Sequence, residues 1–200
     1  MFTVWLRKVF KGVVDPMAAF LARLGISANG LTIAGCLITV SVGVLLAMGH
    51  LRLGGLILLF TMGSDALDGA VARHTGQTSR FGAFLDSSLD RIADASLLLG
   101  LGWWYRGQGG VQDMLAGVAA VGSLLVSYAR ARAEAIGVEC KAGLFTRVER
   151  SLLLVAALVL GLTGPALWIL AIGTVATAIH RILHVFLQTR GEATQGHRDG

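Results

Sequence analysis

The sequence predicts an all-α integral membrane protein, in which six transmembrane helices follow an amphipathic surface helix at the N-terminus. Hydrophobic residues make up 54% of the 200 residues, charged residues make up only 14%, and the mean hydropathy is +0.71. These values lie far from those of soluble domains, and a chain of this length can hold about six spans of roughly 20 residues. Basic residues gather at the ends of apolar segments, so the net charge of +5 indicates a membrane face rather than a nucleic-acid partner.

The chain divides into three parts. In residues 1–15, apolar side chains recur at i, i+3 and i+4 and the basic residues lie off that stripe, which predicts an amphipathic interfacial helix ended by Pro16. Residues 16–190 form the expected six-helix membrane domain. Residues 191–200 are expected to be a polar tail.

Six apolar segments predict the spans. The expected spans are about 28–49, 53–73, 81–104, 112–136, 147–162 and a last one that reaches about 188. Ser27 is the expected N-cap of the first span. The uncharged stretch 151–180 is too long for one span, and Thr163-Gly164-Pro165 is the expected break within it.

The distribution of charge predicts the orientation of the chain in a cell membrane. An even number of spans puts both termini on one side, and only Arg52 and Arg106 fall at the opposite ends of the spans. The positive-inside rule therefore places both termini in the cytoplasm. Trp103 and Trp104 fall at the other interface, where aromatic side chains are enriched.

Four aspartates interrupt two of the apolar segments. Each would cost roughly 2.5–3.5 kcal/mol at the centre of a lipid-facing helix, or about 10 kcal/mol together, so they must face a polar cavity and meet cations. Asp65 and Asp68 are spaced i, i+3, and Asp86 and Asp90 are spaced i, i+4, so each pair shares one helix face. The loop between the two spans is short, so we expect the pairs to lie at similar depth.

Four carboxylates in this arrangement favour a metal site. Hard oxygen ligands suit Mg²⁺ or Mn²⁺, and four of them can hold two ions, an arrangement that suits phosphoryl transfer. Gly69 and Gly82 flank the cluster and let a bulky ligand approach the backbone, and Arg73 is placed to bind a phosphate. The alternative is a set of intramembrane ion pairs that orient helices. However, five acids including Asp94 outnumber the two nearby bases, Arg73 and Arg91. Asp94 itself is interpreted as a packing or supporting group rather than a ligand.

These residues spell a known signature. The fixed positions of the motif are Asp65, Asp68, Gly69, Ala72, Arg73, Gly82, Asp86 and Asp90. In this pattern the chain resembles the CDP-alcohol phosphotransferase (CDP-alcohol phosphatidyltransferase) family over nearly its whole length. The resemblance implies a six-helix membrane fold, a homodimer and a CDP-linked lipid donor. It also implies that Asp65, Asp68 and Asp86 bind metal, and that Asp90 touches metal and takes the proton of the acceptor hydroxyl.

The resemblance also implies a site for the CDP-lipid. Gly69, Arg73 and Gly82 would lie near its nucleotide and diphosphate. Asn29 and Thr32, in the loop that enters the first span, would approach the nucleotide.

A second set of polar residues bears on the acceptor. It consists of the arginines that end the fourth span, begin the fifth and lie on the sixth: Arg130, Arg132, Arg147, Arg150 and Arg181. Several guanidiniums beside a metal site are expected where the acceptor carries its own phosphate, although each could instead belong to an ordinary positive-inside fringe. The pattern resembles the subgroup that transfers a phosphatidyl group from CDP-diacylglycerol to inositol phosphate, the phosphatidylinositol phosphate synthases, with release of CMP. Glycerol-3-phosphate is the alternative acceptor.

The sequence also allows other interpretations of its acidic residues, histidines and cysteines. Intramembrane acids also occur in cation transporters, but no internal repeat is evident in this chain. His180 and His184 have zinc-like i, i+4 spacing without an evident third ligand, so we interpret them as interfacial polar residues. Cys36 and Cys140 are interpreted as ordinary structural cysteines.

Overall fold

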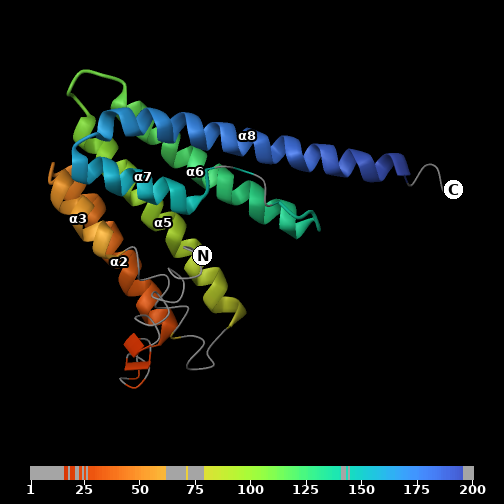
Figure 1. The fold of residues 1–200 in the computed structure, drawn as a ribbon, viewed down its shortest axis with the longest axis horizontal. Coiled ribbons are helices and arrows are strands. Elements are labelled where there is room, and N and C mark those ends of the chain that lie inside the picture. Colours follow the sequence, from red (N-terminus) through yellow and green to blue (C-terminus); the bar gives the residue numbers. More distant parts are fainter. Residues whose placement is uncertain are drawn as a thin grey trace, which may run out of the picture. The chain divides into compact units, whose positions relative to one another are not determined.

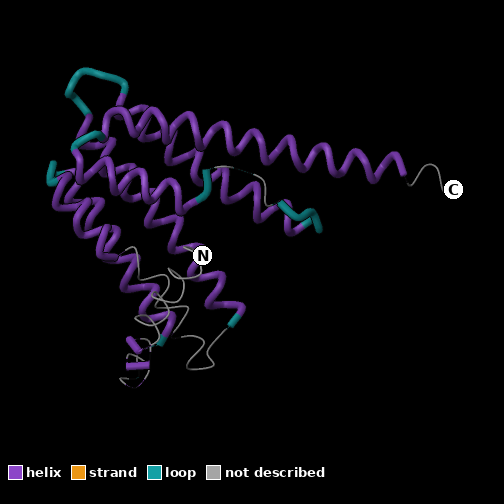
Figure 2. Tube along the Cα trace, in the orientation of Figure 1, coloured by secondary structure: helices purple, strands orange, loops and turns teal. Residues whose placement is uncertain are grey.

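All regular secondary structure in the described part of the chain is helical (Figures 1 and 2). The computed structural model describes residues 16–17, 19–20, 23, 25, 27–61, 71, 79–140, 143 and 145–195. The predicted surface helix at 1–15 and the end of the second span lie outside these residues. Asp65, Asp68, Gly69 and Arg73 therefore do too. The predicted all-α class is confirmed over the remainder.

The helices follow the predicted segments closely. They are α2 (Ala28–Ala47), α3 (Leu51–Thr61), α5 (Arg80–Tyr105), α6 (Gln112–Ala135), α7 (Arg147–Leu160) and α8 (Thr163–Gln195). Among the described helices, α2, α6 and the part of α8 up to Arg190 are long and apolar enough to cross a membrane. Helix α3 is apolar but shorter, and α5 carries several charged residues in its first half.

Serine side chains begin two of the helices. The backbone N–H of Gly30 donates to Ser27 Oγ at 3.1 Å, which confirms Ser27 as the N-cap of α2. At the start of α5, the N–H of Gly82 donates in the same way to Ser79 Oγ at 2.9 Å. Each bond satisfies a backbone donor that has no partner within the first helical turn.

The break before the last helix differs from the prediction. Helix α7 ends at Leu160. The next residue, Gly161, caps it with a φ of 75°, the left-handed conformation that favours glycine, and the Leu162 N–H donates to the Ala157 carbonyl at 2.8 Å. Thr163 already belongs to α8, and Pro165 lies in its first turn, where a missing N–H has no helical partner to lose. The predicted break at Thr163-Gly164-Pro165 is therefore wrong by about one half-turn.

The C-terminal end of α8 is also later than predicted. The helix continues to Gln195, beyond the expected end near residue 188. No proline interrupts this stretch, and the Thr189 hydroxyl bonds back to the Val185 carbonyl at 3.0 Å, so polar sequence alone does not end the helix.

The chain forms two compact units. The first unit comprises residues 1–42 and 57–93, and the second comprises residues 43–56 and 94–200. Within the second unit, α6 and α8 lie side by side (Figure 1). They approach closely at Gly122, where an added Cβ would lie 2.3 Å from Thr174 Oγ1.

A glycine contact joins two helices in the second unit. A Cβ built on Gly100 of α5 would lie 2.0 Å from the carbonyl oxygen of Gly43 in α2, closer than any real side chain allows. The obstacle is backbone, so it cannot move aside as a flexible side chain would. The two helices therefore touch through their main chains at this position.

We expect Gly100→Ala to destabilise the protein by about 3 kcal/mol because the methyl group forces α5 away from α2. Thermal unfolding of the detergent-solubilised protein measures the change. Gly117→Ala in α6 is the matched control, because nothing lies within 4 Å of its added Cβ. That variant should be as stable as the parent or slightly more so, because alanine is the better helix former. Equal unfolding temperatures for the two variants would contradict the close contact.

Candidate active site

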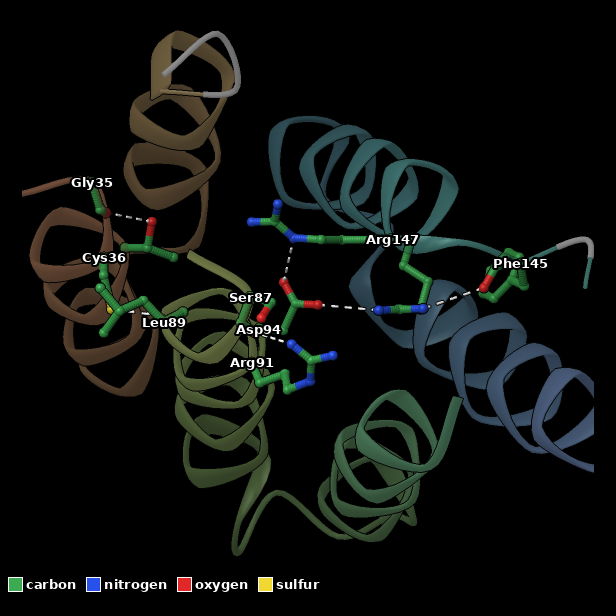
Figure 3. A network of polar contacts seen from close by, with 10 residues as sticks. Gly35, Cys36, Ser87, Leu89, Arg91, Asp94, Phe145 and Arg147 are labelled. Carbon is green, nitrogen blue, oxygen red and sulfur yellow. Dashed lines mark hydrogen bonds and ion pairs between the residues drawn. The ribbon is translucent and has the colours of Figure 1, made fainter. Parts of the chain in front are cut away.

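Two of the four predicted metal ligands lie on α5 in the first unit. Asp86 and Asp90 are one helical turn apart on one face, and both are half-buried. The Cys36 thiol of α2 contacts the Leu89 carbonyl at 3.5 Å, which fixes α2 against α5 beside this pair (Figure 3). No group of three or more His, Cys, Asp or Glu side chains suited to a metal occurs within the described ranges. Asp65 and Asp68 lie outside those residues, and the quartet stays a prediction.

The N-terminal ends of α2 and α5 approach each other in the same unit. A Cβ on Gly82 would lie 3.0 Å from Asn29 Oδ1, so the absence of a side chain at Gly82 leaves the Asn29 amide room. Thr32 lies one turn further along α2 and bonds the Ala28 carbonyl at 3.0 Å. Asn29 and Gly82, which were both predicted to contact the CDP-lipid, are thus neighbours. The other two members of that set, Gly69 and Arg73, lie outside the described residues.

Arg91 is one of the two bases that the sequence places near the acids. Its guanidinium donates to the Ser87 carbonyl one turn earlier on α5 (Figure 3). The contact therefore lies within one helix, and it does not orient one helix against another.

The second unit contains a carboxylate with two arginine partners. Asp94 Oδ2 lies 3.2 Å from Arg150 Nη2, and Asp94 Oδ1 lies 3.7 Å from Arg147 Nε (Figure 3). Arg150 is also held by the Phe145 carbonyl, to which its Nη1 donates at 3.2 Å, and its side chain is only 6% exposed. Asp94 therefore links α5 to the first turn of α7. This agrees with its interpretation as a packing or supporting residue.

The other three arginines of the predicted set differ in their surroundings. Arg181 of α8 is buried and donates to the Val126 carbonyl of α6 at 2.6 Å. Arg130 pairs with Glu134 at 2.8 Å on the exposed side of α6, and Arg132 in the last turn of α6 is exposed as well. Arg130 and Arg150 are both near enough to Arg181 to interact with it electrostatically. Arg181 thus has two of the other arginines within electrostatic range, and Asp94 joins Arg147 to Arg150.

The carbonyl partners of these arginines were not foreseen. The sequence places Asp94 among five acids beside only two nearby bases, and that excess could have indicated partners on another helix. The Phe145 and Val126 carbonyls give no such signal, because every residue has a carbonyl and only the fold decides which ones arginines reach.

The two histidines and the two cysteines are the remaining candidate residues. His180 is exposed and His184 half-buried on α8, and the described residues offer no third ligand to complete a zinc site with them. Cys36 and Cys140 are both free and buried. The buried, free state of the two cysteines agrees with their interpretation as structural residues, and the interpretation of the two histidines stays a prediction.

The described residues define a helical protein with apolar helices long enough to cross a membrane, a pair of carboxylates on α5 and a set of arginines. A sequence profile of the CDP-alcohol phosphatidyltransferase family matches residues 25–180. The chain belongs to this family. It is therefore a transferase of phospholipid synthesis, as the motif predicts, and membership in a transferase family decides against the alternative of a cation transporter.

The chain is similar to several named proteins and to solved structures. A phosphatidylinositol phosphate synthase of Streptomyces avermitilis is 37% identical, covering 92% of this chain and 82% of the relative. An archaetidylinositol phosphate synthase of Methanothermobacter thermautotrophicus is 36% identical, and the match covers 90% of this chain and 92% of the relative. The fold also matches the crystal structure of Mycobacterium tuberculosis phosphatidylinositol phosphate synthase in complex with manganese and citrate, with a TM-score of 0.82. The two sequences are 31% identical, and the match covers 86% of this chain and 88% of that chain. The same enzyme with CDP-DAG bound also gives a TM-score of 0.82, at 31% identity over 87% and 94%.

Proposed function

We propose that the protein transfers a phosphatidyl group from CDP-diacylglycerol to a hydroxyl of inositol phosphate, giving phosphatidylinositol phosphate and CMP. The observation that carries the choice of acceptor is the arginine set of the second unit, in which Arg147 and Arg150 share one carboxylate. Two guanidiniums with one carboxylate leave an excess positive charge, which favours an acceptor that brings its own phosphate. The names of the similar proteins support the same acceptor. Glycerol-3-phosphate is the second candidate, because it also carries a phosphate.

The carboxylates supply the metal site and the base. Asp65, Asp68, Asp86 and Asp90 would hold two divalent ions, Mg²⁺ or Mn²⁺, and the half-buried Asp86–Asp90 pair has the hard oxygen donors that these ions prefer. When bound, such ions neutralise phosphate oxygens of the donor and of the leaving group. The manganese complex of the Mycobacterium tuberculosis enzyme supports this proposal.

Asp90 is the proposed catalytic base. It takes the proton from the acceptor hydroxyl, whose oxygen then attacks the phosphorus bonded to the diacylglycerol. The bond from that phosphorus to the oxygen of the CMP phosphate breaks, and CMP leaves with the electron pair. Asn29, Thr32, Gly69, Arg73 and Gly82 are proposed to bind the CDP-lipid, and the proximity of Asn29 to Gly82 supports this grouping.

The proposed topology is that of a multi-pass cell-membrane protein. Residues 1–15 lie on the surface, residues 16–190 contain six spans, residues 191–200 form a polar tail, and both termini are cytoplasmic. The Tyr105 hydroxyl lies 2.6 Å from Thr163 Oγ1, so the end of α5 and the start of α8 share one end of the second unit, as six spans require. The protein is also proposed to form a homodimer.

A panel of acceptors tests the reaction. CMP release is measured with detergent-solubilised protein, Mg²⁺, CDP-diacylglycerol, and inositol phosphate, glycerol-3-phosphate or free inositol. We expect kcat/KM for inositol phosphate to exceed that for glycerol-3-phosphate by about tenfold or more and free inositol to be nearly inert, because the arginines need a phosphate partner. A preference for free inositol would refute the proposed role of the arginines.

A further inference from the structure

We propose that Asp94 is a positioning residue for acceptor binding, because it fixes the orientation of Arg147 and Arg150. This inference rests on the proposed function, since it assumes an acceptor that carries a phosphate. Asp94 itself would touch neither the acceptor nor the reacting atoms. It would act only through the two guanidiniums.

The geometry divides the two oxygens of Asp94 between the two arginines. Oδ2 accepts a hydrogen bond from Arg150 Nη2 at 3.2 Å, and Oδ1 forms an ion pair with Arg147 Nε at 3.7 Å. The two arginines are spaced i, i+3 in the first turn of α7, so one carboxylate on α5 orients both side chains.

The side chains of the two arginines differ in exposure and in how many contacts hold them. Arg150 is 6% exposed and is held by both Asp94 and the Phe145 carbonyl, so its guanidinium plane is fixed. Arg147 is 37% exposed and is contacted by Asp94 at Nε, the nitrogen nearest its aliphatic stem, so its side chain reaches the surface while Arg150 does not. Bidentate recognition of phosphate needs a guanidinium plane of fixed orientation. Asp94 supplies that orientation while leaving a net positive charge on the group.

The start of α7 is fixed independently of Asp94. The Thr146 hydroxyl donates to the Glu149 carboxylate in the first turn, on the exposed side of the helix. Loss of Asp94 should therefore release the two guanidiniums without unwinding the helix that carries them. This separation predicts a change in acceptor binding rather than a general loss of structure.

Steady-state kinetics of the full-length protein test the inference. For Asp94→Asn, we expect the acceptor KM to rise about tenfold, with the CDP-diacylglycerol KM changed by less than about twofold, because the weakened hydrogen bond to Arg150 and the lost ion pair with Arg147 affect only acceptor binding. Asp94→Glu keeps the charge and should restore most of the affinity. Asp113→Asn, the same chemical change at an exposed aspartate in the first turn of α6, is the matched control and should behave as the parent does.

A double-variant cycle excludes an indirect effect. If Asp94 acts through Arg150, Asp94→Asn combined with Arg150→Gln should raise the acceptor KM no more than Arg150→Gln alone. This pair also replaces both charges by amides, so it provides a second measurement if Asp94→Asn alone does not fold. Inhibition by inorganic phosphate, competitive with the acceptor, should weaken in parallel with the acceptor KM.

Three results would overturn the inference. They are an unchanged acceptor KM in Asp94→Asn, an equal rise in the donor KM, and a fall in the acceptor KM, which would show that Asp94 competes with the phosphate. The parent protein separates these results from failure of the proposed function. If it uses a phosphorylated acceptor and Asp94→Asn behaves as the parent does, only the inference fails. If it uses none, the proposed function fails and the inference fails with it.

Discussion

Asp90→Asn is expected to lower kcat for CMP release by about a thousandfold, because an amide cannot accept the proton of the acceptor hydroxyl. Asparagine has nearly the same size as aspartate and keeps one oxygen, so α5 should fold unchanged. Asp86, one turn earlier on α5, is assigned to metal binding and not to proton transfer. Initial rates at saturating CDP-diacylglycerol and acceptor measure the effect.

The role of Asp90 as base is separated from its role as ligand by a binding measurement. Mn²⁺ binding, followed by electron paramagnetic resonance, should remain largely intact in Asp90→Asn, whereas Asp86→Asn should weaken it. Asp113→Asn is again the matched control, because it removes one carboxylate charge far along the chain from both residues. Turnover of Asp90→Asn near the parent rate would remove Asp90 as the base.

Removal of divalent ions is expected to abolish activity, with a loss of about a thousandfold or more, because the negative charge on the phosphates would then lack its main counterions. The protein is treated with EDTA, desalted, and assayed for CMP release before and after addition of Mg²⁺ or Mn²⁺. Activity should return with either ion and should not return with K⁺ at equal ionic strength.

The number of ions is tested in the same preparation. Titration with Mn²⁺ should reach two ions per chain, because four carboxylates provide enough oxygen ligands for a pair of ions. A single ion at saturation would require a different assignment of the four aspartates. Turnover that persists after exhaustive chelation would refute the metal site altogether.

Most of the fold could be predicted from the sequence because its signals are local. Apolar runs of membrane-spanning length gave the centres of α2, α5, α6 and α7, and the hydroxyl at Ser27 gave the start of α2. The ends of α8 were missed for two physical reasons. Pro165 fits a first helical turn as readily as it ends a helix, and a polar stretch without proline can continue one. Three of the described helices meet the length and composition of a span, so the number of six stays a prediction.

The candidate site was predictable in part. Spacing along one helix puts Asp86 and Asp90 on one face, and this needs no knowledge of the tertiary structure. The approach of Asn29 to Gly82 was suggested only by the family motif. The pairing of Asp94 with Arg147 and Arg150 depends on how α7 packs against α5. No local pattern reports that packing, which is why the carboxylate partner of these arginines was not identified, and their grouping as an acceptor site stays a prediction.

The burial of both native thiols has a practical consequence. Cys36 and Cys140 are only 9% and 1% exposed, so water-soluble maleimides should react with them slowly. New cysteines placed one at a time in the terminal segments or in the turn near Gly107 can then be tagged in intact cells without first deleting the natural ones. The pattern of tagging from outside and inside the cell would assign each segment to its side of the bilayer.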